Sequence, residues 1–352
     1  MCPENSFRVA PFIALYSLTH LAVDAACAFL LLGVLELKDH VILSMLLYNA
    51  IAFVLQAPFG YLMDKALNPR LAAILGLAFV AVSFLCWNII FAALIMVGIG
   101  NALFHVGGGS LVLSLKNRKA TFSGIYVAPG GIGLALGSFL AVSLIDVNPM
   151  VFPWVLVMLG LILYFVKTPE FNRAKEPKYT SNYGMLIIAC ILFPIAVRSL
   201  IGLSIEFPWK ENVSLYVVLI VALALGKVFG GMLTDRYGLI KVGVGGLLLA
   251  MPFLSFFPSI PALGILGAFL FNFTMPVTLI AIWSMMPGNK GLSFGLTTAA
   301  LFIGSIPVIM GKNAWMKNDL VVFSLILTAL VILLVALRLM DRLKQERRKN
   351  EL

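Results

Sequence analysis

Two residues with titratable side chains, His20 and Asp24, lie in an otherwise apolar stretch near the start of the chain. They are four positions apart, so both side chains would lie on one face of a helix. An ionisable residue at the centre of a bilayer costs roughly 2.5–3.5 kcal/mol on insertion scales and is therefore a functional candidate. Because His changes charge between about pH 5 and 8, the pair predicts a proton-coupling site. The alternative is a structural hydrogen-bonded pair that ties this helix to a neighbour.

The composition indicates a protein that lies largely within a membrane. Of the 352 residues, 61% are hydrophobic and only 11% are charged. Soluble domains carry about 25% charged residues, so the composition excludes an ordinary soluble enzyme. The four cysteines are widely spaced and form no Cys-x-x-Cys or Cys/His cluster. We therefore expect free thiols, no metal and no cofactor.

Twelve apolar stretches, each close to the ~20 residues that a spanning helix needs, predict an all-α membrane protein with twelve transmembrane helices. The stretches are residues 10–33, 40–63, 70–88, 90–113, 121–144, 150–166, 183–205, 212–234, 241–258, 261–286, 291–311 and 319–340. A polar segment at 168–182 predicts a cytoplasmic linker between two six-helix bundles, residues 1–167 and 183–340. A basic tail follows at 341–352.

The basic residues of the loops predict the orientation. With the N-terminus in the cytoplasm, the outer loops hold only Lys38, Lys210, Lys312 and Lys317. Lys and Arg accumulate in cytoplasmic loops, so we expect both termini in the cytoplasm of a multi-pass protein of the cell (inner) membrane. The net charge of +10 follows from this pattern, and no nucleic-acid partner is expected.

The two halves are related by a constant shift. Residues 60–65 read GYLMDK and residues 231–236 read GMLTDR, and their aspartates Asp64 and Asp235 lie 171 positions apart (235 minus 64). The same shift joins three further pairs: Asn101 with Asn272, Gln56 with Lys227, and Gly124 with Gly295. Such repeats are typical of transporters in which two halves rock around a central site.

Buried polar residues are unevenly distributed among the predicted helices. The third, sixth, ninth and twelfth helices have apolar interiors. The others contain His20, Asp24, Gln56, Asn101, His105, Arg198, Lys227 and Asn272. Polar groups within a membrane face the bundle interior or a wet cavity, so we expect every third helix at the periphery and the remaining eight around a cavity. Asn101 and His105 share a helix face and predict a contact with substrate or proton, or else an interhelical hydrogen bond.

The chain resembles the major facilitator superfamily in its 6+6 repeat and in the loop sequences GYLMDK and GGMLTDRYGLIK. Three stretches resemble the fosmidomycin resistance branch: SLTHLAVD at 17–24, QAPFGYLMDK at 56–65 and GIGNALFHVGGG at 98–109. The resemblance implies a secondary transporter that works by alternating access, with proton-coupled efflux (antiport) of a small molecule and a role in drug resistance. Uptake by proton symport and a non-transporting membrane sensor are the alternatives.

Arg198 and Lys227 predict that the substrate is an anion. Together they would make the second half of the cavity positive, and Arg suits bidentate contact with a carboxylate or phosphonate. One of them could also pair with Asp24 across the cavity. The alternative is that each side chain snorkels its charge to the nearer membrane surface. We assign Gln56 and Asn272 to the substrate site as well.

The resemblance also implies a gate on the cytoplasmic side. Asp64 would meet the start of the eleventh helix and Asp235 the start of the fifth, where a carboxylate caps a helix N-terminus and favours its dipole. The gating residues would be Gly60, Asp64, Arg70, Gly231, Asp235 and Arg236. The alternative is that these charges are solvated turn residues.

An enzyme is not expected. The sequence GLSFG at 291–295 matches G-x-S-x-G, but it opens a predicted membrane helix, whereas a hydrolase elbow must follow a strand. The expected partners are a small anionic molecule, protons and the lipid bilayer, and we expect the chain to act as a monomer.

Overall fold

The computed structural model describes residues 8–35, 37, 40–115, 119–143, 145–171 and 182–350. Positions 172–181 of the predicted linker, the predicted outer-loop residue Lys38 and positions 351–352 of the predicted tail lie outside these residues. The described part of the chain is helical, with no strand, so the prediction of an all-α fold is confirmed.

The first half holds seven α-helices and two short π-helical segments. The helix α1 (Val9–Phe29) continues into η1 (Leu30–Val34). The second helical segment is continuous from α2 (Val41–Asn49) through η2 (Ala50–Val54) to α3 (Gln56–Lys65). The remaining helices are α4 (Pro69–Ser83), α5 (Ile90–Val112), α6 (Lys119–Val142) and α7 (Val151–Phe165).

The second half repeats this order. Its first three helices are α8 (Asn182–Ser204), α9 (Val213–Tyr237) and α10 (Leu239–Phe256). A fourth segment is made of α11 (Pro261–Phe271) and α12 (Thr274–Met285), and α13 (Lys290–Ile309) and α14 (Asp319–Asn350) complete the half. Short 3-10 turns precede α9 and α14 at η3 (Pro208–Glu211) and η4 (Ala314–Lys317).

Each of the twelve predicted stretches coincides with a helical segment, but the segments are not equal in length. Within the described residues, ten are long and apolar enough to cross a membrane. The helices α4 and α7 have 15 residues each. At 1.5 Å per residue they reach only about 22 Å, less than the ~30 Å hydrocarbon core. The predicted stretch at 70–88 is therefore too long, because α4 gives way to turns after Ser83. The predicted stretch at 150–166 nearly matches α7, which starts after the turn at 148–150.

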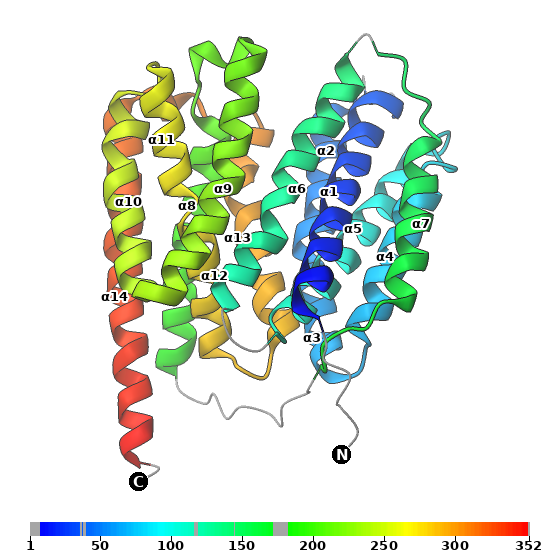
Figure 1. The fold of residues 1–352 in the computed structure, drawn as a ribbon. Helices are drawn as coiled ribbons and strands as arrows, with labels where there is room; N and C mark the ends of the chain where they lie inside the picture. The colour runs from blue at the N-terminus through cyan, green and yellow to red at the C-terminus, as the bar shows by residue number, and fades with distance from the viewer. Residues whose placement is uncertain are drawn as a thin grey trace, which may run out of the picture.

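The two halves stand side by side, with α1–α7 in one bundle and α8–α14 in the other (Figure 1). The helix α1 begins and α14 ends on the same side of the molecule, here called the terminal side (Figure 1). Two helix pairs make the most extensive contacts between the halves, α6 with α9 and α3 with α13. Smaller contacts join α12 to α6 and α13 to α5. The shift of 171 residues relates one pair to the other, so the internal repeat produces a two-fold interface.

Close backbone contacts allow these pairs to form. A Cβ atom added to Gly60 would overlap the backbone of Gly291. A Cβ added to Gly231 would overlap the backbone of Ala120. Gly60 and Gly231 are related by the repeat, as are Ala120 and Gly291, so the same close approach occurs twice. Small residues at helix contacts are typical of membrane proteins, because they let backbones approach closely.

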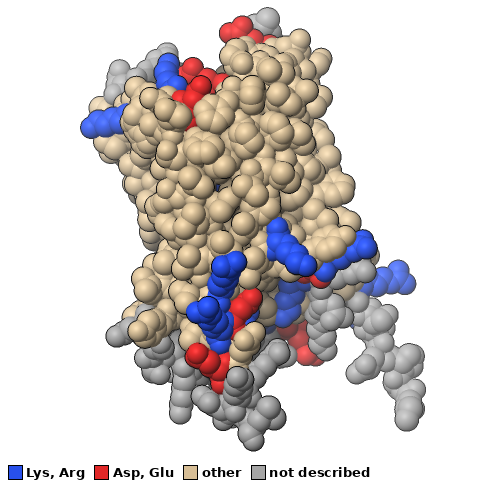
Figure 2. Space-filling view, turned by 90° about the vertical axis from the view of Figure 1, so that its left-hand side faces the viewer, with Lys and Arg blue, Asp and Glu red and all other residues tan. Residues whose placement is uncertain are grey.

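The surface agrees with a multi-pass membrane protein. Charged side chains gather toward the two ends, and a wide band between them is almost free of charge (Figure 2). Large apolar side chains point outward from the edge helices: Trp154 of α7 is 71% exposed, and Leu320 of α14 is 66% exposed. In a membrane such residues would contact lipid.

Candidate functional site

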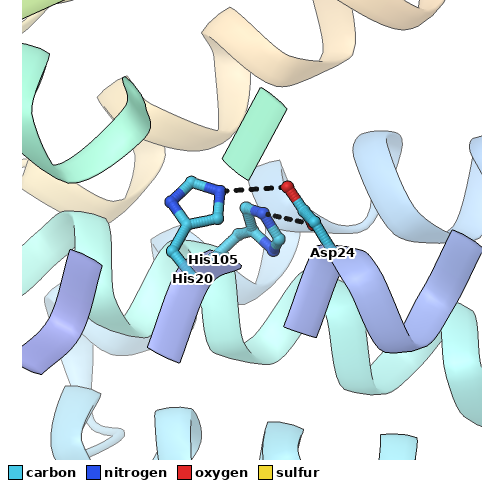
Figure 3. A group of neighbouring side chains, drawn as sticks. All are labelled: His20, Asp24 and His105. Atoms are coloured by element: carbon cyan, nitrogen blue, oxygen red, sulfur yellow. Dashed lines mark ion pairs between the residues drawn. The ribbon is translucent and has the colours of Figure 1, made fainter. Parts of the chain in front are cut away.

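The structure brings His105 of α5 to the pair formed by His20 and Asp24 on α1 (Figure 3). The Nε2 atom of His20 lies 3.3 Å from Oδ2 of Asp24. The Nε2 atom of His105 lies 3.2 Å from Oδ1 of the same carboxylate. The two imidazole rings meet edge to face, with their centroids 4.4 Å apart. Each carboxylate oxygen of Asp24 is thus engaged by one imidazole. We call these three residues the His–Asp–His cluster.

The other nitrogen of each imidazole faces a backbone carbonyl. The Nδ1 atom of His20 lies 2.8 Å from the carbonyl oxygen of Tyr126, and Nδ1 of His105 lies 2.8 Å from that of Asn101. A carbonyl oxygen has no proton to give, so each Nδ1 carries the proton and donates it. Each Nε2 then either carries a second proton or presents a lone pair toward Asp24.

A proline in α6 leaves one backbone carbonyl of this helix without its helical donor. Pro129 lies inside the helix and has no N–H, so the carbonyl of Ile125 loses its helical donor. The hydroxyl of Ser17 donates to this carbonyl at 3.2 Å. In membrane helices, side chains of this kind commonly satisfy groups that a proline frees. The next carbonyl, of Tyr126, is the one that receives His20.

The helix α6 packs tightly against the cluster. A Cβ atom added to Gly130 would lie 2.6 Å from Oδ2 of Asp24 and would overlap the ring of His20. The hydroxyl of Tyr126 donates to the backbone carbonyl of His105 at 3.2 Å. The same helix therefore positions both histidines, and its glycine leaves room for their partner.

The cluster is buried but not sealed. The exposed fractions of the side chains are 6% for His20, 11% for His105 and 19% for Asp24. Asn101 lies beside the cluster, with its Nδ2 atom 3.4 Å from Oδ1 of Asp24 and 3.5 Å from Sγ of Cys27. Solvent can therefore reach the carboxylate. Asn101 and His105, which we predicted to contact substrate or proton, thus both contact Asp24.

The two basic residues of the second half have polar contacts within the protein. Arg198 is buried in α8, and its Nη1 atom lies 3.4 Å from the hydroxyl of Thr274. Lys227 of α9 crosses between the halves, and its amine lies 3.5 Å from the backbone carbonyl of Val127 on α6. Both polar contacts are therefore made within the protein. Among the described residues, Asp24 forms its ion pairs with the two histidines and not with Arg198 or Lys227.

Gln56 and Asn272 are not brought to the cluster by the contacts that the structure describes. The amide of Gln56 donates to the carbonyl of Ala52 at 2.7 Å, and that of Asn272 donates to the carbonyl of Ala268 at 2.9 Å. Both bonds stay within the residue's own helical segment. The Oε1 atom of Gln56 is buried without a hydrogen-bond partner.

The two repeat-related aspartates cap helices of the opposite half. Asp64 accepts hydrogen bonds from the backbone N–H groups of Gly291 and Leu292, both at 2.9 Å. Asp235 accepts from the N–H groups of Ala120 at 3.2 Å and Thr121 at 2.9 Å, and from the Thr121 hydroxyl at 2.7 Å. These contacts lie at the N-terminal ends of α13 and α6. They hold the halves together on the terminal side.

The two arginines assigned to the gate have other contacts. The Nε atom of Arg70 donates to the carbonyl of Leu163 at 3.0 Å, and its guanidinium lies 5.5 Å from the ring of Tyr164. Arg70 therefore joins α4 to α7 within the first half. The guanidinium of Arg236 lies 5.2 Å from the ring of its neighbour Tyr237.

Comparison with known proteins gives the fold a name. The chain is 24% identical to the uncharacterized MFS-type transporter YfnC of Bacillus subtilis (strain 168), in an alignment that covers 74% of each chain. The structure superposes on the E. coli fucose:proton symporter FucP with a TM-score of 0.69 and 16% identity, covering 94% of this chain and 98% of that one. The chain has the major facilitator fold.

A second solved structure agrees. The human organic anion transporter MFSD10 (TETRAN) superposes with a TM-score of 0.68 and 15% identity, covering 95% of this chain and all of that one (100%). No protein-family model matches the chain. These similar proteins are transporters and not enzymes, in agreement with the expectation from the sequence. The resemblance to the fosmidomycin resistance branch stays a prediction.

Within this major facilitator fold, sequence reasoning missed two lysines at the contact between the halves. The amine of Lys119 lies 3.7 Å from the ring centroid of Trp283 on α12. The amine of Lys290 lies 3.1 Å from the hydroxyl of Ser114, just after α5. Lys119 and Lys290 are also related by the shift of 171, and this relation in the sequence could have identified them. Each lysine begins a helix of the interface and reaches the opposite half.

Proposed function

We propose that the protein is a secondary active transporter that moves a small anionic molecule by alternating access and couples this movement to protons. The His–Asp–His cluster carries the proposal, because it places a carboxylate between two imidazoles near the middle of the first helical segment. The fold supports transport: FucP is described as a fucose:proton symporter and MFSD10 as an organic anion transporter. The loop charges favour a location in the inner membrane with cytoplasmic termini.

In this proposal Asp24 and the histidines handle the protons. Both Nδ1 protons are committed to carbonyl oxygens, so protons enter and leave at the Nε2 atoms and the carboxylate. The partial exposure of Asp24 lets it exchange protons when one side of the membrane gains access. Asn101 would sense the charge of Asp24 from the neighbouring helix.

The basic residues of the second half would bind the anion. Arg198 is buried and Lys227 is half-buried, and both carry positive charges without a described carboxylate partner. Such charges attract an anion in a medium of low dielectric. The guanidinium of Arg198 suits a carboxylate or phosphonate. Gln56, Asn101, His105 and Asn272 would complete the substrate contacts as the halves move.

The direction of transport that we propose is efflux by antiport, as the resemblance to the fosmidomycin resistance branch implies, with a role in drug resistance and action as a monomer. Uptake by symport is the second candidate, since FucP is a proton symporter with the same fold.

The experiment that tests the proposal is reconstitution into liposomes that contain a pH-sensitive dye. Candidate phosphonates and carboxylates are added outside under an imposed pH gradient. A substrate-dependent change in internal pH is expected, and its sign separates antiport from symport. Proton movement equal to that of protein-free liposomes for every anion tested would contradict proton-coupled anion transport.

Arg198→Gln should weaken anion binding by about tenfold or more, because a hydrogen bond to a charged group contributes roughly 1.5–3 kcal/mol and 1.4 kcal/mol is tenfold in affinity. Binding of the transported anion to the purified protein can be followed by calorimetry. Arg338→Gln makes the same chemical change at an exposed position of α14 and should leave affinity unchanged. Equal affinities of the two variants would remove Arg198 from the substrate site.

A further inference from the structure

Three ligand atoms of the His–Asp–His cluster converge on one region. The Nε2 atoms of His20 and His105 and a carboxylate oxygen of Asp24 all lie within 4.8 Å of one another. The two nitrogen–oxygen distances are 3.3 Å and 3.2 Å. Ligands bound to one tetrahedral zinc at about 2.0–2.2 Å are separated by about 3.3–3.5 Å. Each imidazole nitrogen is therefore at ligand spacing from one oxygen of Asp24, and small side-chain movements within the 4.8 Å limit would bring all three ligands onto one ion.

The outer contacts of the two histidines are also those of metal ligands. A metal-bound histidine almost always donates its other ring N–H to a carboxylate, carbonyl or water, which fixes its tautomer. Both Nδ1 atoms do so here, to the carbonyls of Tyr126 and Asn101 at 2.8 Å. When neither imidazole carries a second proton, the lone pairs of both Nε2 atoms are directed at the carboxylate. A cation between them would relieve the repulsion of these electron-rich atoms.

Gly130 leaves space beside these atoms. A Cβ added to it would lie 2.6 Å from Oδ2 of Asp24 and would overlap Nε2 of His20. A methyl group at this position would therefore take the space next to two of the three ligand atoms. Gly131, one residue further, is different, since its nearest contact is the flexible end of Lys227 at 3.4 Å.

We propose that His20, Asp24 and His105 form a binding site for one divalent transition-metal cation of the zinc class. Two imidazoles and one carboxylate, with a further position for water, are a ligand set that such ions accept. The cation would use the same lone pairs that protons use in the proposed function. On the basis of that function, bound zinc excludes the coupling protons and inhibits transport.

The test uses the purified full-length chain in detergent, free of any polyhistidine tag, with no substrate and no gradient. Zn²⁺ binding is measured by equilibrium dialysis, and Co²⁺ serves as a spectroscopic probe. We expect one Zn²⁺ per chain and no competition from Mg²⁺, which prefers an octahedral shell of oxygens. His20→Ala and His105→Ala should weaken binding by at least about tenfold, since loss of even an outer-shell partner costs 10–100-fold.

The chain provides two matched controls. It has three histidines, and the third, His40, lies at the exposed start of α2, so His40→Ala should bind zinc like the wild type. Gly130→Ala keeps every ligand but fills the space, and it should abolish the visible absorption of bound Co²⁺. Gly131→Ala should preserve this absorption. If the histidine variants do not fold, the comparison of Gly130→Ala with Gly131→Ala still tests the metal site.

Zinc binding that survives both cluster histidine variants, or that is lost equally in His40→Ala, would overturn the inference. So would equal binding by the two glycine variants. Because binding is measured without transport, the two proposals fail separately. Absent zinc binding with intact proton coupling would contradict only the metal site. Zinc binding without any substrate-dependent proton movement would contradict only the proposed function.

Discussion

Asp24→Asn should reduce substrate-dependent proton movement to the level of protein-free liposomes. The amide has nearly the shape of the carboxylate and can still form hydrogen bonds with His20 and His105, which lie 3.3 Å and 3.2 Å from it. It cannot take up a proton or balance the charge of an imidazolium. Transport against a gradient should therefore be lost, while substrate binding, assigned mainly to the second half, should remain. Internal pH and accumulated substrate are measured in the same liposomes.

Asp146→Asn is the matched control, because it makes the same change at an exposed position between α6 and α7. It should leave proton movement and its pH dependence unchanged. If Asp24→Asn left proton movement unchanged, as this control should, proton coupling through the His–Asp–His cluster would be contradicted. Retained binding with lost uphill transport is the expected combination.

Asp64→Ala should open the terminal side of the molecule. The buried carboxylate accepts two backbone N–H bonds from the start of α13, both at 2.9 Å. A hydrogen bond to a charged group contributes roughly 1.5–3 kcal/mol, so loss of even one such contribution shifts the ratio of open to closed states by about tenfold or more. A cysteine introduced at Ser293, which is fully buried at this end of α13, reports the change in a cysteine-free background. Its labelling by a maleimide should accelerate correspondingly.

Asp235→Ala should also accelerate the labelling of this cysteine, but by a smaller factor than Asp64→Ala. Asp235 makes the repeat-related contact with α6, but it is exposed, so water replaces its bonds at lower cost. Asp341→Ala removes an exposed carboxylate near the same end and should not change the labelling rate. Identical labelling of the Asp64 and Asp341 variants would mean that the cap does not hold this side closed.

The sequence by itself determined the helical architecture and its repeat. Apolar stretches of spanning length cannot satisfy their backbone groups in lipid except as helices, so the hydropathy pattern is sufficient to predict them. The constant shift between Asp64 and Asp235 predicted two equivalent halves without any contact information. The pairing of His20 with Asp24 was also local, because residues four apart on a helix share a face.

The sequence also showed an asymmetry. The shift of 171 places apolar residues, Ile191 and Ile195, where the first half has His20 and Asp24. The repeat therefore gives His20 and Asp24 no acidic or histidine counterpart in the second half, a conclusion that needs no coordinates. The length of α4 was not visible in hydropathy, because the predicted stretch at 70–88 continues into turns that the composition does not distinguish from helix. The predicted stretch at 150–166 was already short and nearly matches α7.

Only the tertiary structure decided which partners the buried polar groups have. His105 joins Asp24 because α5 packs beside α1 with a particular rotation, which sequence spacing does not specify. Tyr126 and Gly130 belong to the site through a backbone carbonyl and a missing Cβ, features that no side-chain motif records. Arg70, which we assign to the gate, joins α4 to α7 through a carbonyl that the sequence does not point to. The period of a helix determines which residues share a face, but packing determines what that face meets.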